Sequence, residues 1–225
     1  MNPSWRKHRG IAIIGTLWLG SIATGLGLLA DYAAQPGLIG QVPQQWPQST
    51  QLSLAPDRHT VVLAVHPRCP CTRASINELE RSIGHAKTPP QIYALVFEPT
   101  TDEATDLHAN FAATDITRNL RRIPNTTVIP DPGSTIAADF GALTSGHAIV
   151  YDTKGNLVFS GGLTPTRAHE GPNTGTESLK RLFNGDQPIA QNAPVFGCPL
   201  CSETKGIKLE TCFDAATCPS TEVQP

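Results

Sequence analysis

The stretch TVVLAVHPRCPCTRASINELERSIGHA, residues 60–86, decides the fold class. Residues 60–66 are rich in β-branched side chains, which predicts a short strand. Residues 72–86 place Ile76, Leu79 and Ile83 at helical spacing, so a helix is expected to follow. The run QIYALVF at residues 91–97 then completes a β-α-β unit, whose crossover should be right-handed. The domain is therefore predicted to begin with two parallel strands.

Shorter segments complete the predicted sheet. The sequence DTKGN between two apolar runs indicates a hairpin, because Gly155 and Asn156 accept the positive φ angles of a tight turn. Ser134 or Asp131 is the expected N-cap of a short helix. We predict an α/β fold with a central mixed sheet flanked by helices. The expected helices cover residues 114–122, 134–140 and 177–183, and the expected strands cover residues 126–129, 148–151 and 157–160.

An uncharged stretch near the N-terminus predicts a membrane anchor. Residues 11–30 carry no charge, and at 1.5 Å per residue twenty helical residues span about 30 Å. Three basic residues lie within residues 1–10, and none follows the stretch before Arg58, so residues 1–10 are placed in the cytoplasm. A cleaved signal peptide is the alternative, but its apolar region is usually shorter. The rest of the chain is therefore expected in the periplasm or another extracytoplasmic space.

Composition limits the number of domains and the class of partner. The chain has 225 residues, 16% of them charged, and a net charge of −2, which suits one domain with appendages and offers no basic face for nucleic acid. Residues 31–57 are rich in Pro and Gln and predict an extended tether. Residues 58–186 form the expected domain. Residues 187–225 are predicted to be an irregular tail that holds four of the six cysteines.

Cys69 and Cys71 lie between the first predicted strand and the first predicted helix. The N–H groups and positive dipole end of that helix stabilise a thiolate, and Arg68 and Arg73 add positive charge. We therefore expect a lowered pKa for Cys69 and attack by its thiolate on a disulfide, with Cys71 releasing the mixed disulfide. A buried or permanently bridged cysteine pair is the structural alternative.

Four motifs carry a resemblance to a known family: HPRCPCTRA (66–74), TSGHAIVYDTKGNLVFSGGLT (144–164), RAHEGPNTG (167–175) and VFGCPLC (195–201). Over residues 58–201 the chain resembles the thioredoxin-like family and, more narrowly, the RedB-type membrane-anchored thioredoxin-like proteins. The resemblance implies a thioredoxin-like fold with Cys69 as the attacking cysteine. Thr72 stands where the family usually has its resolving cysteine, and Gly146 stands near the usual cis-proline.

The C-terminal cysteines provide a second candidate partner for Cys69. Cys198 is a candidate resolving or redox partner, with Cys201 beside it, because the tail is long enough to fold back over the site. Cys198, Cys201, Cys212 and Cys218 would also fit a four-thiolate zinc site, although the second spacing is wide for one. Tail disulfides are the more ordinary interpretation outside the cytoplasm.

Histidines and loop residues leave alternatives open. His66, His147 and His169 are expected near the Cys69 end of the sheet, and one of them would complete a copper site with Cys69 and Cys71. Arg167 and Glu170 either pair and order their loop or belong to a partner-binding lip.

The sequence therefore favours a membrane-anchored thiol–disulfide oxidoreductase that acts on protein thiols or disulfides and needs no cofactor. A copper-handling or metalloprotein-assembly factor that binds metal through Cys69, Cys71 and His66 is the alternative. A non-catalytic thioredoxin-like binding module is the third hypothesis.

Overall fold

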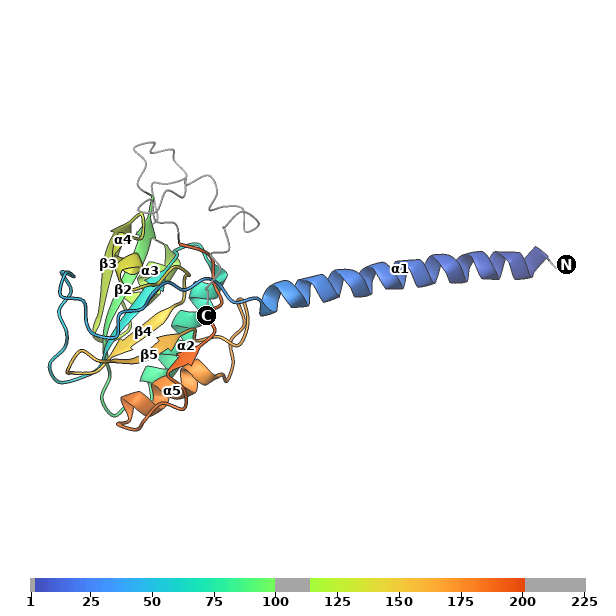
Figure 1. Ribbon diagram of the computed structural model, residues 1–225. Helices are drawn as coiled ribbons and strands as arrows, with labels where there is room; N and C mark the ends of the chain where they lie inside the picture. The colour runs from blue at the N-terminus through green and yellow to red at the C-terminus, as the bar shows by residue number, and fades with distance from the viewer. Residues whose placement is uncertain (1–2, 100–113, 201–225) are drawn as a thin grey trace. The chain divides into compact units, whose positions relative to one another are not determined.

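The computed structural model describes residues 3–99 and 114–200 of the chain, which divides into two units, residues 1–35 and residues 36–225. The first unit is α1 (Pro3–Ala34), drawn as one continuous helix in Figure 1. Its segment Gly10–Ala34 has a mean hydropathy of 1.8, so by length and composition it could cross a membrane. Large apolar side chains of this helix, such as Leu17 (69% exposed), are not buried. The predicted apolar helix is confirmed; its topology stays a prediction.

The second unit is built on a six-stranded mixed sheet in the order β3-β2-β1-β4-β5-β6. The first three strands are parallel, β4 is antiparallel to β1, and β5 is antiparallel to β4. This arrangement confirms the predicted β-α-β unit and the hairpin. The strands are β1 (Thr60–Val65), β2 (Gln91–Glu98), β3 (Thr126–Pro132), β4 (Ala148–Tyr151), β5 (Leu157–Gly161) and β6 (Asn192–Ala193).

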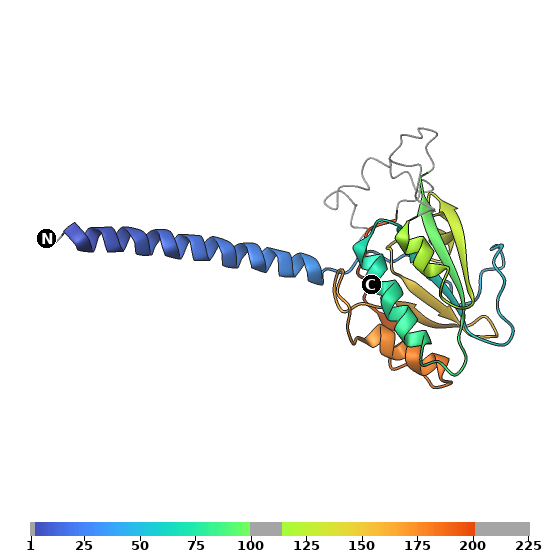
Figure 2. The same ribbon diagram turned by 180° about the vertical axis from the view of Figure 1, so that it is seen from behind.

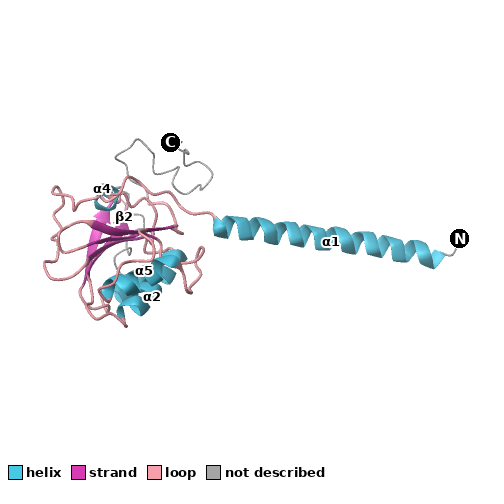
Figure 3. Cartoon of the chain, turned by 60° about the horizontal axis from the view of Figure 1, so that its bottom comes forward, coloured by secondary structure: helices cyan, strands magenta, loops and turns pink. Residues whose placement is uncertain are grey.

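Helices cover the two faces of this sheet unequally. Apolar residues of α2, α3 and α5, among them Leu79, Leu120 and Leu182, are buried against one face. Figure 3 shows α2 and α5 together on that face, and Figure 2 shows the same pair from behind. The other face is covered by α4 and by residues before β1. The architecture is the thioredoxin-like fold; its helices are α2 (Pro70–Ile83), α3 (Asp115–Leu120), α4 (Thr135–Asp139) and α5 (Thr174–Phe183).

The short helix α4 is capped by one of the two predicted residues. The backbone N–H groups of Ile136 and Ala137 donate to the carboxylate of Asp131, each at 2.9 Å. Ser134 occupies the N-cap position with a φ of 56° and makes no side-chain cap. Asp131 therefore satisfies the free N–H groups at the start of this helix.

The predicted tether over residues 31–57 is wrong for most of its length. Residues 31–34 belong to α1, and residues 36–57 belong to the second unit. Trp46 is 8% exposed and packs edge-on against Phe140 and Tyr151, with ring centroids 5.3 and 5.2 Å away. The N–H of Trp46 also donates to the carbonyl of Gly155 at 2.8 Å. All residues of β1 and β4 are buried, so both faces of the sheet must be covered there. Residues 36–57 supply part of the cover on the second face.

The tail is also more ordered than predicted. Residues 192–193 form β6, and Val195, Phe196 and Leu200 are buried. The packed domain therefore runs to residue 200 rather than ending at residue 186. Cys201, Cys212 and Cys218 lie outside the described residues, so the zinc and tail-disulfide hypotheses stay predictions.

Candidate thiol site

Cys69 occupies the turn between β1 and α2. It is the N-cap of α2, with φ −92° and ψ 122°, and Pro70 follows as the first helical residue. Proline suits that position because it has no N–H to leave unsatisfied. The N–H of Cys69 donates to the carbonyl of His66 at 3.1 Å, which fixes the turn. The thiol therefore lies at the positive end of a fourteen-residue helix.

Three cysteines meet at this turn, all of them with free thiols. The Sγ atoms of Cys69 and Cys198 are 2.8 Å apart although 129 residues separate them in the chain. The hydroxyl of Ser145 donates to Cys69 Sγ at 3.4 Å. Hydrogen bonds from Cys198, from Cys71, from Ser145 and from the N–H of Thr72 hold the pKa of Cys69 well below its usual range.

The other two thiols shift in the opposite direction. Hydrogen bonding to Cys69 and burial raise the pKa of Cys71 and of Cys198. The positive charge of Arg167 opposes this rise in both, and the N–H of Ala168 opposes it in Cys71. These opposite shifts favour the thiolate form at Cys69 and the protonated form at Cys71 and Cys198. This is the asymmetry that a nucleophile and its resolving partner require.

The cations near the thiols differ from the prediction. Arg73 forms an ion pair with Asp115 at 2.5 Å, so its charge is already matched. Arg68 acts on His66, whose pKa it helps to lower. Arg167, which the sequence left between a loop and a partner role, is the cation that acts on Cys71 and Cys198.

Residues 195–200, called the tail segment below, bring Cys198 to the site. Its residues pair with the main chain of residues 143–145, called the docking edge below. The N–H of Ser145 donates to the carbonyl of Cys198 at 2.9 Å, and the N–H of Leu200 donates to the carbonyl of Leu143 at 2.8 Å. Between these bonds Thr144 and Pro199 form an antiparallel bridge. The tail segment therefore lies as a short additional strand.

The position of Pro199 fits this pairing. In an antiparallel pair of this kind the backbone nitrogen of each directly opposed residue points away from the partner strand. Pro199 therefore loses no hydrogen bond to Thr144, and its ring leaves no donor on the outer edge of the tail segment.

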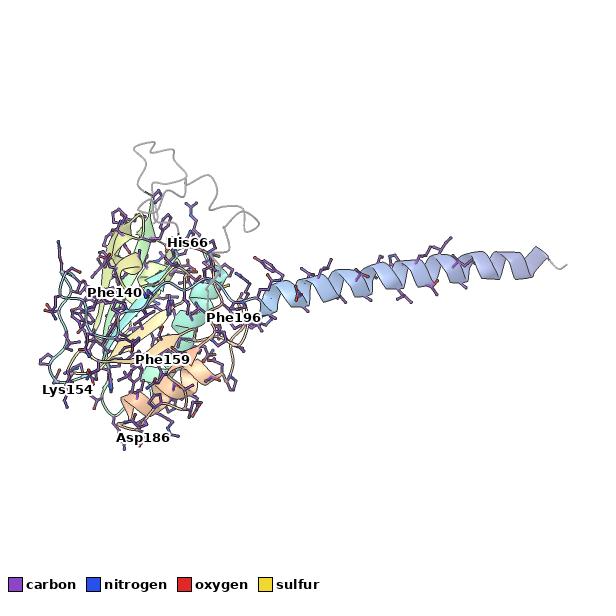
Figure 4. The ribbon with its side chains drawn as sticks, viewed as in Figure 1. His66, Phe140, Lys154, Phe159, Asp186 and Phe196 are labelled. Atoms are coloured by element: carbon purple, nitrogen blue, oxygen red, sulfur yellow. The ribbon has the colours of Figure 1, made fainter. Side chains whose placement is uncertain are left out.

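The remaining predicted site residues near the turn have structural contacts. His66 stacks on Phe97 with ring centroids 5.3 Å apart, and its Nδ1 accepts the N–H of Arg68 at 3.3 Å. Gly146, which replaces the cis-proline, has a φ of 83° and donates its N–H to the carbonyl of Ala64 at 2.7 Å. A Cβ there would lie 2.6 Å from the hydroxyl of Ser75. Both the positive φ angle and this close contact therefore favour glycine at position 146. Figure 4 labels His66 together with Phe196 of the tail segment.

Two of the predicted histidines contact oxygen atoms. His147 is fully buried, its Nε2 lies 2.8 Å from the hydroxyl of Ser160, and burial lowers its pKa to about 4. The Nδ1 of His169 lies 2.7 Å from the carbonyl of Arg167 in its own loop. His147 therefore belongs to the buried core, and His169 contacts the main chain of the loop that carries Arg167.

Glu170 holds that loop against α2, together with residues that the sequence analysis did not assign. The carboxylate of Glu170 accepts hydrogen bonds from Asn77 and Arg81, and buried Glu78 accepts the N–H of Gly171 at 2.7 Å. The guanidinium of Arg167 then reaches the carbonyl of Gly197 in the tail segment. The loop therefore forms hydrogen bonds both with α2 and with the tail segment.

Ser145 is a further site residue that the sequence analysis did not assign. Its hydroxyl contacts Cys69 and also accepts the N–H of Cys198 at 3.0 Å. Its place in TSGHA, directly before Gly146 and the hairpin strand, is the sequence feature that points to it.

The copper alternative requires Cys69, Cys71 and one histidine to share an ion. Within residues 3–99 and 114–200 no cluster of three or more His, Cys, Asp or Glu side chains is arranged to hold an ion. Two thiolates on one tetrahedral ion at about 2.3 Å would be about 3.8 Å apart. The Sγ atoms of Cys69 and Cys198 are closer than that, at 2.8 Å. A spacing of 2.8 Å is longer than the roughly 2.05 Å of a disulfide bond, so the two sulfurs are in close contact without being bonded.

The comparisons with known proteins agree with the fold. No protein-family model matches this chain, and no curated protein matches its sequence. Among solved structures, the chain is similar to a hypothetical protein from Sinorhizobium meliloti 1021, with 15% identity, a TM-score of 0.50 and coverage of 74% of this chain and 93% of that one. An uncharacterized conserved protein from Geobacillus kaustophilus has 18% identity and a TM-score of 0.49, over 75% of this chain and 89% of that one.

A third similar structure is a secreted disulfide oxidoreductase of Mycobacterium tuberculosis, described as homologous to E. coli DsbE. It has 14% identity and a TM-score of 0.33, over 44% of this chain and 66% of that one. At identities this low, these similarities concern the fold alone.

Proposed function

We propose that this protein catalyses thiol–disulfide exchange on protein substrates, with Cys69 as the attacking thiolate. The observation that carries the proposal is the sulfur cluster at the start of α2, where the Sγ atoms of Cys69 and Cys198 are 2.8 Å apart. A lowered pKa for Cys69 beside two protonated thiols supplies both the nucleophile and the group that completes the reaction.

The proposed reaction has two steps. The Cys69 thiolate attacks one sulfur of a client disulfide, which forms a Cys69–client disulfide and releases the other client sulfur as a thiolate. A second thiol of the site then loses its proton and attacks Cys69 Sγ, which releases the first client sulfur. The client gains two thiols and the protein gains one disulfide; run backward, the same steps oxidise a client dithiol.

Two residues compete for the second role. Cys71 is the sequence-based candidate, and its thiol donates a hydrogen bond to Cys69. A disulfide between Cys69 and Cys71 would close a small strained ring across Pro70. Cys198 approaches from a different chain segment and has no such restriction. We therefore assign the resolving step to Cys198.

The proposed location follows from α1. We propose that Gly10–Ala34 anchors the chain in a membrane with the domain outside the cytoplasm, where disulfides form and persist. The closer kinship with the RedB-type proteins is likewise a proposal, which rests on the four sequence motifs.

Trapping of the intermediate tests the proposed function. The reduced full chain in detergent is mixed with a peptide disulfide, quenched with acid and analysed by mass spectrometry. We expect the wild type and Cys71→Ser to release both peptide thiols and to end with a Cys69–Cys198 disulfide. Cys198→Ser should release only one thiol and remain linked to the peptide through Cys69, because its resolving thiol is missing.

A stalled Cys71→Ser variant beside a normal Cys198→Ser variant would move the resolving role to Cys71. An unmodified Cys69 in all three proteins, combined with tight stoichiometric Cu(I) binding, would replace the redox function with the copper-handling one. Neither activity would favour the binding module.

A further inference from the structure

The site as described is closed to a protein client. Cys69 is 1% exposed and Cys71 is 4% exposed, so no disulfide on another protein can reach the attacking sulfur in this state. Cys198 of the tail segment lies in contact with that sulfur. Something must therefore move before the proposed reaction can begin.

The tail segment is held in the manner of a bound peptide. It is extended, it pairs with the docking edge through two main-chain hydrogen bonds, and it presents a cysteine sulfur to Cys69. Main-chain pairing with an exposed edge is a general way for a protein to bind an extended segment, with side-chain pockets adding selectivity.

Side chains on both sides of Cys198 fit this description. Leu200, two residues after the cysteine, is 6% exposed in the apolar cluster that contains Ala64 and Phe140. Gly197, directly before the cysteine, has no room for a side chain, because a Cβ there would lie 1.9 Å from the carbonyl oxygen of Ser145. The docking edge therefore accepts a glycine before the cysteine and an apolar residue two positions after it.

We infer that the tail segment is an internal substrate that occupies the docking edge for an extended, cysteine-containing peptide of the client. It must leave before the client reaches Cys69, and it brings Cys198 back to Cys69 for the resolving step. The inference rests on the proposed function and adds to it a substrate class. The client segment should have glycine before its cysteine and an apolar residue two positions beyond, as residues 197–200 do. Arg167 helps to keep the internal substrate in place through the carbonyl of Gly197.

Exchange with synthetic peptides tests the inference. The probes are the hexapeptide VFGCPL and its variant VFVCPL, each with its cysteine joined to a chromogenic aromatic thiol. The Cys69 thiolate attacks the peptide sulfur, forms the Cys69–peptide disulfide and releases the coloured thiolate. The symmetrical aromatic disulfide serves as a small probe that needs access to Cys69 but does not pair with the docking edge. Single-turnover rates are measured with the reduced full chain.

Two variants form a matched pair. Gly197→Ala should displace the tail segment, because its Cβ would meet the Ser145 carbonyl oxygen at 1.9 Å. Gly84→Ala adds the same methyl group at the end of α2, where the nearest atom is 3.5 Å away. Dividing each peptide rate by the small-probe rate removes any change in the pKa of Cys69 that follows loss of the Cys198 hydrogen bond.

We expect Gly197→Ala to raise this ratio for VFGCPL about tenfold or more, and Gly84→Ala to leave it at the wild-type value. VFVCPL should react about tenfold more slowly than VFGCPL, since one misfit group in a close site has an effect of this size. Equal ratios in the two variants, or equal rates for the two peptides, would overturn the inference.

A second variant and the small-probe rate provide two additional checks. Should Gly197→Ala fail to fold, Arg167→Gln removes the hydrogen bond to the Gly197 carbonyl without adding bulk, and the ratio should rise in the same direction. A small probe that does not react with Cys69 in the wild type would instead count against the proposed function itself.

Discussion

Replacement of Cys69 by serine should slow the fast phase of disulfide exchange by at least about 1000-fold and leave only the slower reaction of the other cysteines. A serine hydroxyl stays protonated at neutral pH, so the hydrogen bonds from Cys71, Cys198 and Ser145 would converge on a group that cannot attack a disulfide. The measurement is the single-turnover release of coloured thiolate from an aromatic disulfide by the reduced chain.

Cys71→Ser is the matched control, because it makes the same sulfur-to-oxygen change two residues away and leaves the attacking sulfur in place. It should retain the first step within about tenfold of the wild type, with the hydrogen bond to Cys69 now given by a hydroxyl. Equal losses in the two variants would contradict the assignment of Cys69 as the sole nucleophile.

Replacement of Trp46 by alanine should lower the free energy of unfolding of the domain by about 3–5 kcal/mol. Trp46 is 8% exposed between Phe140 and Tyr151, and its removal would leave a cavity on the second face of the sheet. For a domain of this size the change corresponds to a fall in Tm of about 10 °C. Thermal unfolding of the full chain in detergent, followed by near-ultraviolet circular dichroism, measures it.

Trp18→Ala provides the control for that experiment. Trp18 lies in α1 and is 64% exposed, so the same substitution should leave the melting of the second unit unchanged. If Trp46→Ala melts at the wild-type temperature, residues 36–57 contribute no packing to the domain. That result would support the prediction of an extended tether for this segment.

The sheet could be predicted from sequence because its apolar runs have clear periods. Residues 60–66 and 91–97 have no rival interpretation as helix, and the glycine and asparagine of the hairpin mark its turn. Residues 36–57 escaped prediction because Trp46, Leu52 and Leu54 are isolated among prolines and glutamines. Single apolar residues without a period reveal nothing about whether a segment packs.

The site was partly predictable for a similar reason. Cys69 follows from its place at a helix start, which is a local property of the chain. The contact between Cys69 and Cys198 joins residues 129 positions apart, so spacing alone could offer it only as an alternative to Cys71. The roles of Ser145 and Arg167 depend on how two loops and the tail segment meet, which no local pattern records.

The central claim, that Cys69 is the reactive thiolate, is tested most directly by the pH dependence of alkylation at each cysteine. The reduced full chain is treated briefly with iodoacetamide from pH 4 to 10, and each site is quantified by peptide mass spectrometry. Cys69 should react first, with a midpoint below the value of about 8.5 for free cysteine, while Cys71 and Cys198 react later with midpoints above it. A midpoint for Cys69 at or above the free value, or earlier labelling of Cys71 or Cys198, would contradict the account.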